Sequence, residues 1–149
     1  MTTSTTPLLQ LDALRVAIGE KTILQSISLD VAPGELVVLM GANGSGKSTL
    51  GLALAGHPAY QVTHGTAQLN GADLLAMEPQ DRARAGLFLS FQSPPEIPGV
   101  KNNLFIRTAM NAVRAARGEE PQDAYDFLGS AKAAATTLGL PEKMLSRPV

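Results

Sequence analysis

Apolar and polar residues follow a strand-like pattern near the start of the chain. The runs LLQLDALRVAI (residues 8–18) and TILQSISLDV (residues 22–31) have the length and composition of strands, and the second alternates apolar and polar positions imperfectly. Gly19, Glu20 and Lys21 lie between the two runs and can form a turn. The pattern predicts an antiparallel pair of strands over residues 8–31.

Two shorter runs, LVVLM (residues 36–40) and LFLSF (residues 87–91), are nearly continuous in apolar residues. Such runs are typical of strands that are buried on both faces of a sheet. Alternation of strands with helices predicts an α/β domain, with these two runs in a mixed or parallel sheet core. Three elements are predicted between them: a helix over residues 48–56, a turn at Asn70-Gly71 and a short helix over residues 79–85.

The chain changes character after residue 92. A proline-rich loop, QSPPEIPGV, is followed by two alanine-rich stretches of helical period, NNLFIRTAMNAVRAAR and PQDAYDFLGSAKAAATTLGL. We therefore expect three regions: a disordered N-terminus at residues 1–7, a nucleotide-binding α/β core at residues 8–92, and a loop with a helical subdomain at residues 93–149.

Composition narrows the class of protein. The 149 residues are about one domain, 44% hydrophobic and 17% charged, with a formal net charge of -1 and no cysteine. This charge gives no basic field for nucleic acid, and without cysteine there is no thiolate metal site. No basic N-terminal region precedes an apolar run, and no apolar stretch approaches the ~18 residues of a membrane span. We expect a cytoplasmic protein with no nucleic-acid partner and no direct membrane insertion.

A glycine-rich loop connects the run at residues 36–40 to the predicted helix. Its sequence, MGANGSGKSTL, contains the phosphate-loop pattern of glycine, four residues, and Gly-Lys-Ser. Glycine lets the backbone N–H groups approach phosphate oxygens, Lys47 adds a positive charge, and the hydroxyl of Ser48 is a suitable ligand for Mg²⁺. The predicted phosphate-binding residues are Gly41, Ala42, Asn43, Gly44, Ser45, Gly46, Lys47, Ser48 and Thr49.

The segment GANGSGKSTL, with Gln92 about 45 residues later, resembles the ABC-type ATPases. The stretches FQSPPEIPGVKNNLFIRTAMNAVRAARG and LAGHPAYQVTHGTAQLNGADLL are similar to the SufC family, the ATPase subunits of the Suf iron–sulfur cluster assembly machinery. The resemblance implies a P-loop NTPase fold of the ABC type, with an antiparallel β subdomain, a mixed sheet core and the start of a helical subdomain. It also implies ATP and Mg²⁺ as cofactors and scaffold rearrangement as the purpose of ATP hydrolysis.

The same resemblance assigns expected roles to residues outside the loop. Gln92 matches the glutamine whose amide oxygen contacts Mg²⁺ and the attacking water. Ile18 stands where many ABC domains stack an aromatic residue on adenine, so we expect only an aliphatic contact there. The region between Ser93 and Arg117 matches the docking surface for scaffold subunits of the SufB and SufD type, although a helix packed on its own domain would show the same pattern. The complete family members also form an ATP-dependent dimer.

The elements that hydrolysis requires do not follow in this sequence. An ABC domain uses an apolar strand ending in Asp-Glu and a signature segment around Ser-Gly-Gly, and neither is present. His57 and His64 are interpreted as ordinary surface or turn residues. We expect a truncated N-terminal portion of a longer protein, which binds nucleotide, lacks a complete catalytic set and does not hydrolyse ATP.

Three functions remain open from the sequence. The first is the ATP-binding subunit of an iron–sulfur cluster assembly machinery. The second is the ATP-binding subunit of an ABC membrane transporter. The third is a nucleotide-binding interaction module without enzymatic activity.

Overall fold

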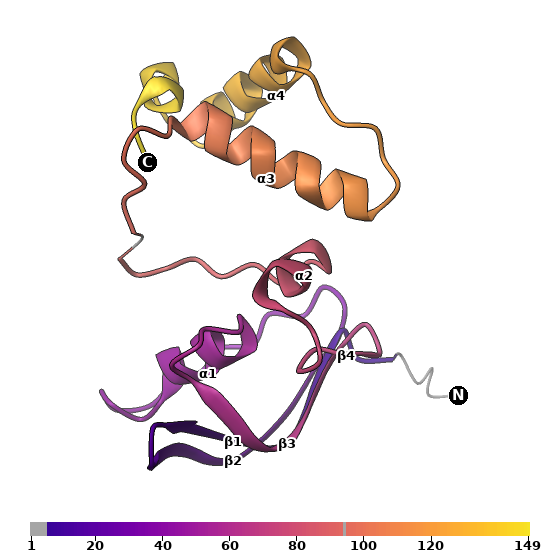
Figure 1. Cartoon of the computed structure of the whole chain (residues 1–149), viewed down its shortest axis with the longest axis vertical. Coiled ribbons are helices and arrows are strands. Elements are labelled where there is room, and N and C mark those ends of the chain that lie inside the picture. The colour runs from indigo at the N-terminus through magenta and orange to yellow at the C-terminus, as the bar shows by residue number, and fades with distance from the viewer. Residues whose placement is uncertain (1–5, 94) are drawn as a thin grey trace. The chain divides into compact units, whose positions relative to one another are not determined.

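The computed structural model describes residues 6–93 and 95–149. The chain divides into two compact units, Met1–Leu89 and Ser90–Val149, coloured indigo to magenta and orange to yellow in Figure 1. Of the predicted disordered N-terminus, residues 1–5 lie outside the described residues. Thr6 and Pro7 have no regular secondary structure.

The first unit contains a four-stranded antiparallel sheet, with the strands β1 Leu9–Ile18, β2 Lys21–Val31, β3 Gln61–Leu69 and β4 Ala72–Asp73. In the strand order β2-β1-β3-β4, each strand is antiparallel to its neighbours. Asn70 and Gly71 both have positive φ, 51° and 77°, as a two-residue hairpin turn between β3 and β4 requires. The predicted antiparallel pair and this turn are confirmed.

Two helices belong to this unit: α1, Lys47–Leu54, and α2, Pro79–Arg84. Both match the predicted helices. Helix α1 buries one side against the sheet, and each fully buried leucine or valine contributes about 1.5–3 kcal/mol to stability. The core that results from this packing consists of Leu11, Leu14, Val16, Leu24, Leu50, Ala53, Leu54, Ala67, Leu69 and Leu74.

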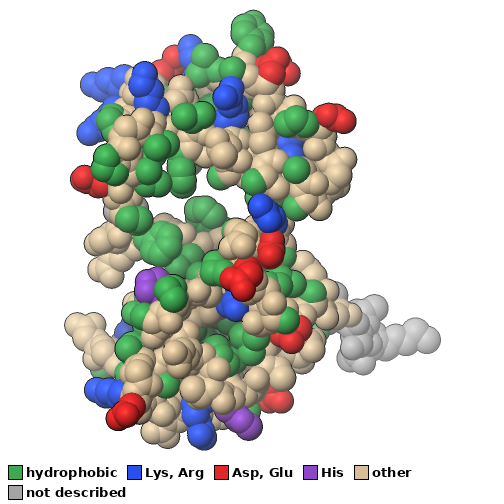
Figure 2. All heavy atoms as spheres, in the orientation of Figure 1, with side chains coloured by type: hydrophobic (Ala, Val, Ile, Leu, Met, Phe, Trp, Pro, Cys, Tyr) green, Lys and Arg blue, Asp and Glu red, His purple; other side chains and the backbone are tan. Residues whose placement is uncertain are grey.

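The prediction of two buried core strands is wrong. Residues 36–40 and 87–91 form no strand, and their apolar side chains are largely exposed, with Leu36, Met40 and Phe88 each at 88%. A strand buried on both faces needs neighbouring strands for its backbone groups and helices over its faces. The described residues supply neither to these segments. Figure 2 shows hydrophobic side chains, in green, at the surface of both units.

The second unit is helical. It contains α3, Asn102–Ala116, α4, Ala124–Thr137, and the 3₁₀ helix η1, Glu142–Ser146, so both helices predicted here are confirmed. Phe127 of α4 is its largest buried side chain among the described residues. The described part of the chain contains no helix both long and apolar enough to cross a membrane.

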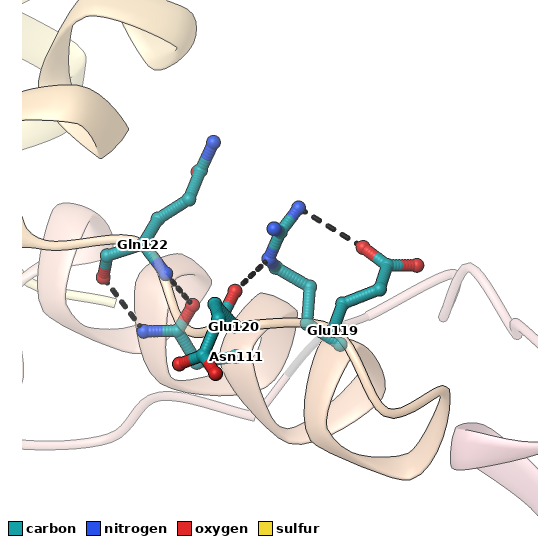
Figure 3. A network of polar contacts seen from close by, with 5 residues as sticks. Asn111, Glu119, Glu120 and Gln122 are labelled. Atoms are coloured by element: carbon teal, nitrogen blue, oxygen red, sulfur yellow. Dashed lines mark hydrogen bonds and ion pairs between the residues drawn. The ribbon is translucent and has the colours of Figure 1, made fainter.

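Side-chain amides and carboxylates shape the connection between α3 and α4 (Figure 3). The amide of Asn111 donates to Gln122 O and accepts from Gln122 N, both at 2.9 Å. Arg114 Nε donates to Glu120 O at 2.7 Å, and its Nη1 lies 3.1 Å from a carboxylate oxygen of Glu119. Asp123 then accepts hydrogen bonds from two N–H groups in the first turn of α4. The connection between α3 and α4 is therefore held by side chains of α3 at one end and by the N-cap of α4 at the other.

Candidate phosphate-binding site

The glycine loop forms a tight turn directly before α1. Ser45 N donates to Ala42 O at 3.2 Å, which closes the first part of the loop. Gly44 and Gly46 have φ values of +80° and +94°, a region that residues with a Cβ rarely adopt. The two glycines therefore let the chain turn and enter the helix within a few residues.

Gly46 also lies against the sheet. A Cβ built at this position would overlap Cδ2 of Leu24, a buried residue of β2. At the start of the loop, a Cβ on Gly41 would lie 2.9 Å from Ser45 Oγ. The lack of a side chain at both positions lets the loop close on itself and rest on β2.

The loop ends at the N-terminus of α1, which has free donors. Gly46 is the N-cap and provides no side-chain cap, and the first turn contains no acidic residue. The first N–H groups of a helix have no partner within it, and the helix dipole favours an anion at this end. Ser48 is exposed in this first turn, whereas Thr49 is buried beneath it. The arrangement suits a phosphate group.

Lys47 is the first residue of α1, and its side chain reaches back to the start of the glycine loop. Its Nζ donates to Gly41 O and Ala42 O, both at 2.8 Å, and lies 3.4 Å from Ser45 Oγ. All three acceptors are uncharged, and no carboxylate among the described residues forms an ion pair with Lys47. The positive charge is therefore not neutralised by the protein and is available to an anionic ligand.

The nine predicted phosphate-binding residues thus form one continuous loop and helix end. The predicted adenine contact, Ile18, is the last residue of β1 and is 40% exposed. The predicted magnesium contact, Gln92, is exposed and belongs to the second unit. Within residues 6–93 and 95–149, no cluster of His, Cys, Asp or Glu has the composition of a metal site.

Sequence reasoning did not identify Arg82 of α2, a buried residue that contacts the far end of α1. Its Nη1 donates to Ala53 O at 3.0 Å and to Leu54 O at 2.9 Å, while Nε donates to Met77 O at 2.9 Å. Burial lowers the pKa of the Arg82 guanidinium, and the negative charges of Glu78 and Asp73 oppose this shift. An arginine side chain nevertheless stays protonated at neutral pH, so a cation lies at the C-terminal end of α1.

Comparison with known proteins identifies relatives of this chain. It is 49% identical over 142 residues to the probable ATP-dependent transporter SufC of Escherichia coli. The match covers 95% of this chain and 57% of that protein. A probable ATP-dependent transporter ycf16 of Antithamnion is 44% identical with the same coverage. A probable ABC transporter ATP-binding protein of Streptococcus pyogenes is 42% identical over 140 residues, which cover 94% of this chain and 54% of that protein.

These comparisons confirm the resemblance to SufC and the predicted P-loop fold class of the ABC type. The chain spans little more than half the length of these relatives. The family model described as ABC transporter matches residues 24–147, which include the glycine loop and most of both units. This chain therefore belongs to the ABC transporter family.

Proposed function

We propose that residues 41–49 bind the triphosphate of ATP and that the chain is the ATP-binding part of an iron–sulfur cluster assembly ATPase. The position of Lys47 is the main support, because its ammonium group lies inside the loop on three uncharged acceptors. A phosphate would offer that ammonium group a charged acceptor, and such hydrogen bonds are roughly twice as strong as neutral ones.

Each part of the loop has a proposed task. The N–H groups from Gly44 to Thr49 hold phosphate oxygens, and Lys47 follows the β and γ phosphates. The exposed hydroxyl of Ser48 is the proposed ligand of Mg²⁺ in this loop, and Mg²⁺ neutralises phosphate charge when bound. The amide of Gln92, in the second unit, is proposed as a Mg²⁺ contact on the family resemblance alone. Ile18 is the proposed aliphatic contact for adenine. The loop fits these groups because no side chain between Gly44 and Thr49 carries a negative charge.

Turnover belongs to a longer protein in this proposal. The 149 residues contain neither an Asp-Glu pair at the end of an apolar strand nor adjacent glycines for a signature segment. The chain alone is therefore proposed to bind ATP without hydrolysing it. Hydrolysis, the ATP-dependent dimer and the movement of scaffold subunits are proposed for the complete protein, in the cytoplasm.

The first experiment measures Mg-ATP binding and phosphate release by this chain, by calorimetry and by a phosphate assay. We expect binding without turnover, and Kd about 10- to 100-fold weaker in Lys47→Ala, since hydrogen bonds to charged groups contribute about 1.5–3 kcal/mol. Lys132→Ala is the matched control, because Lys132 is an exposed lysine of α4 that pairs with Glu142. Equal affinity in both variants would refute the phosphate site. Hydrolysis that depends on Lys47 would refute binding without turnover.

The iron–sulfur role rests on similarity to SufC, whereas the names of all three relatives describe transporters or transporter subunits. Those names support the alternative of an ABC membrane transporter subunit. Capture of partners from cells that express the chain separates the two functions. Scaffold proteins of the SufB and SufD type are expected, and a membrane permease would favour the alternative.

The proposed scaffold surface lies between Ser93 and Arg117, a region in which Pro94 is outside the described residues. On α3, Phe105 and its neighbours Leu104 and Ile106 are exposed apolar residues. Phe105→Glu should therefore reduce capture of the scaffold proteins. Tyr125→Glu on α4, where Tyr125 is 86% exposed, is the control and should leave capture unchanged. Equal capture by both variants would exclude this part of α3 from the interface.

A further inference from the structure

Arg82 connects three parts of the first unit. Its side chain is buried, with 8% of the residue exposed, and no carboxylate in the described parts of the chain forms an ion pair with it. Its hydrogen bonds go to backbone carbonyls: Ala53 and Leu54 at the end of α1, and Met77 in the connection from β4 to α2. Nη2 also donates to Leu75 O, in the same connection, at 3.5 Å. A single planar guanidinium thus joins α1 to the segment before α2.

The carbonyls that Arg82 binds are groups that a helix cannot satisfy by itself. The last C=O groups of an α-helix have no donor within the helix. Ala53 O also accepts from Gly56 N at 3.1 Å, whereas the donor to Leu54 O among the described residues is Arg82; both carbonyls belong to buried residues. Without Arg82, Leu54 O would carry the full cost of desolvation, whereas Ala53 O would keep one hydrogen bond. The guanidinium also places a positive charge at the negative end of the helix dipole.

Helix α1 is short, so its two ends depend on each other. It has eight residues, about 12 Å in length, with the candidate phosphate site at its N-terminus. At that distance, and with solvent screening, direct attraction between Arg82 and a phosphate is weak. Loss of the last turn would instead leave about one turn to hold the N–H groups of Gly46 to Thr49 in place.

We propose that Arg82 is a positioning residue for nucleotide binding: it fixes the C-terminal end of α1 and thereby the phosphate-binding N–H groups at the other end. The inference rests on the proposed function of residues 41–49. Arg82 itself does not contact the nucleotide. Its role is to keep α1 in one orientation relative to the sheet, through carbonyls that only a multidentate donor can reach together.

The test compares Mg-ATP binding to the whole 149-residue chain with its Arg82→Met, Arg82→Lys and Arg84→Met variants. Arg84 is the matched control, since it is an exposed arginine of the same helix that pairs with Asp81. A second control, Leu69→Ala, removes a buried side chain of β3 and lowers stability without removing any of the hydrogen bonds that Arg82 makes to the end of α1. Hydrogen exchange at Gly46 to Thr49 reports the order of the site directly.

At a temperature where each variant is folded, Arg82→Met is expected to weaken Mg-ATP binding about fivefold or more and to speed exchange at those amides. Arg82→Lys should fall between Arg82→Met and wild type, because lysine keeps the charge without the planar fork. Arg84→Met and Leu69→Ala should bind as wild type, although Leu69→Ala melts earlier.

The outcomes separate this inference from the proposed function. A wild-type chain that does not bind Mg-ATP overturns both. If the wild type binds Mg-ATP and Arg82→Met has the same Kd, the inference alone is overturned. A loss of affinity in Leu69→Ala as large as that in Arg82→Met also overturns the inference alone, since general destabilisation would then explain the effect. If Arg82→Met does not fold, Arg82→Lys decides, and a wild-type Kd there overturns the inference.

Discussion

Gly46 is the position where the glycine loop is most constrained, and Gly46→Ala is the sharpest test of how the loop is built. Two separate features oppose a side chain there: the φ of +94° and the overlap of a Cβ with Cδ2 of Leu24. Gly44 shares the first feature, with φ +80°, but has no atom within 4 Å of a built Cβ. The pair of variants therefore separates backbone strain from packing.

The two costs follow from this geometry. An alanine in a left-handed conformation costs about 1–2 kcal/mol, which applies to Gly44→Ala and Gly46→Ala alike. Overpacking against a buried side chain costs about 1–3 kcal/mol more, and it applies to Gly46 alone. Gly46→Ala should thus lower the free energy of unfolding by about 2–5 kcal/mol, against about 1–2 kcal/mol for Gly44→Ala.

Urea unfolding of both variants measures these losses, and a double variant tests their origin. Leu24→Val shortens the opposing side chain at a cost of about 1 kcal/mol. Combined with Gly46→Ala, it should destabilise less than the sum of the single variants by about 1 kcal/mol or more. Equal losses for the two alanine variants, or full additivity in the double variant, would refute the packing of Gly46 on β2.

Three other expectations concern features outside the loop. Asn111→Ala leaves two partly buried backbone groups of Gln122 unpaired. The free energy of unfolding of the second unit, measured in urea, should therefore fall by about 1–3 kcal/mol. A fall below about 0.5 kcal/mol would contradict the role of this amide. Asp123→Ala removes the N-cap of α4 and should cost about 1 kcal/mol, whereas Asp123→Asn should retain most of it; equal losses would argue against capping. Met40 is an apolar residue that is 88% exposed, so we expect the chain to self-associate in sedimentation velocity and Met40→Gln to reduce that association; an unchanged sedimentation profile would contradict this expectation.

Elements with local signals could be predicted from the sequence. The β1–β2 pair follows from two strand-like runs around a glycine turn, and Asn70-Gly71 from the positive φ that both residues tolerate. Helices α3 and α4 follow from alanine-rich stretches of helical period, and the phosphate loop from its glycine spacing. In each case the information lies within a few residues of the element.

Features that depend on distant residues could not be predicted in this way. An apolar run such as residues 36–40 indicates a buried strand only if neighbours cover it, and the run itself does not contain that information. Arg82 looks the same in sequence as Arg84, yet it is buried, whereas Arg84 forms a surface ion pair with Asp81. The contact of Gly46 with Leu24 joins residues of different elements and likewise has no local signal.

The structure supports the two halves of the phosphate loop differently. The second half continues into α1, which packs on the sheet and whose C-terminal carbonyls accept hydrogen bonds from Arg82. The first half follows the exposed residues 36–40, and Lys47 holds it through Gly41 O and Ala42 O. A phosphate that draws the ammonium group of Lys47 away from these carbonyls would therefore also loosen the first half of the loop. The affinity of this chain for ATP should thus reflect a balance, because an ion pair with phosphate forms while two hydrogen bonds from the ammonium group to uncharged carbonyls break.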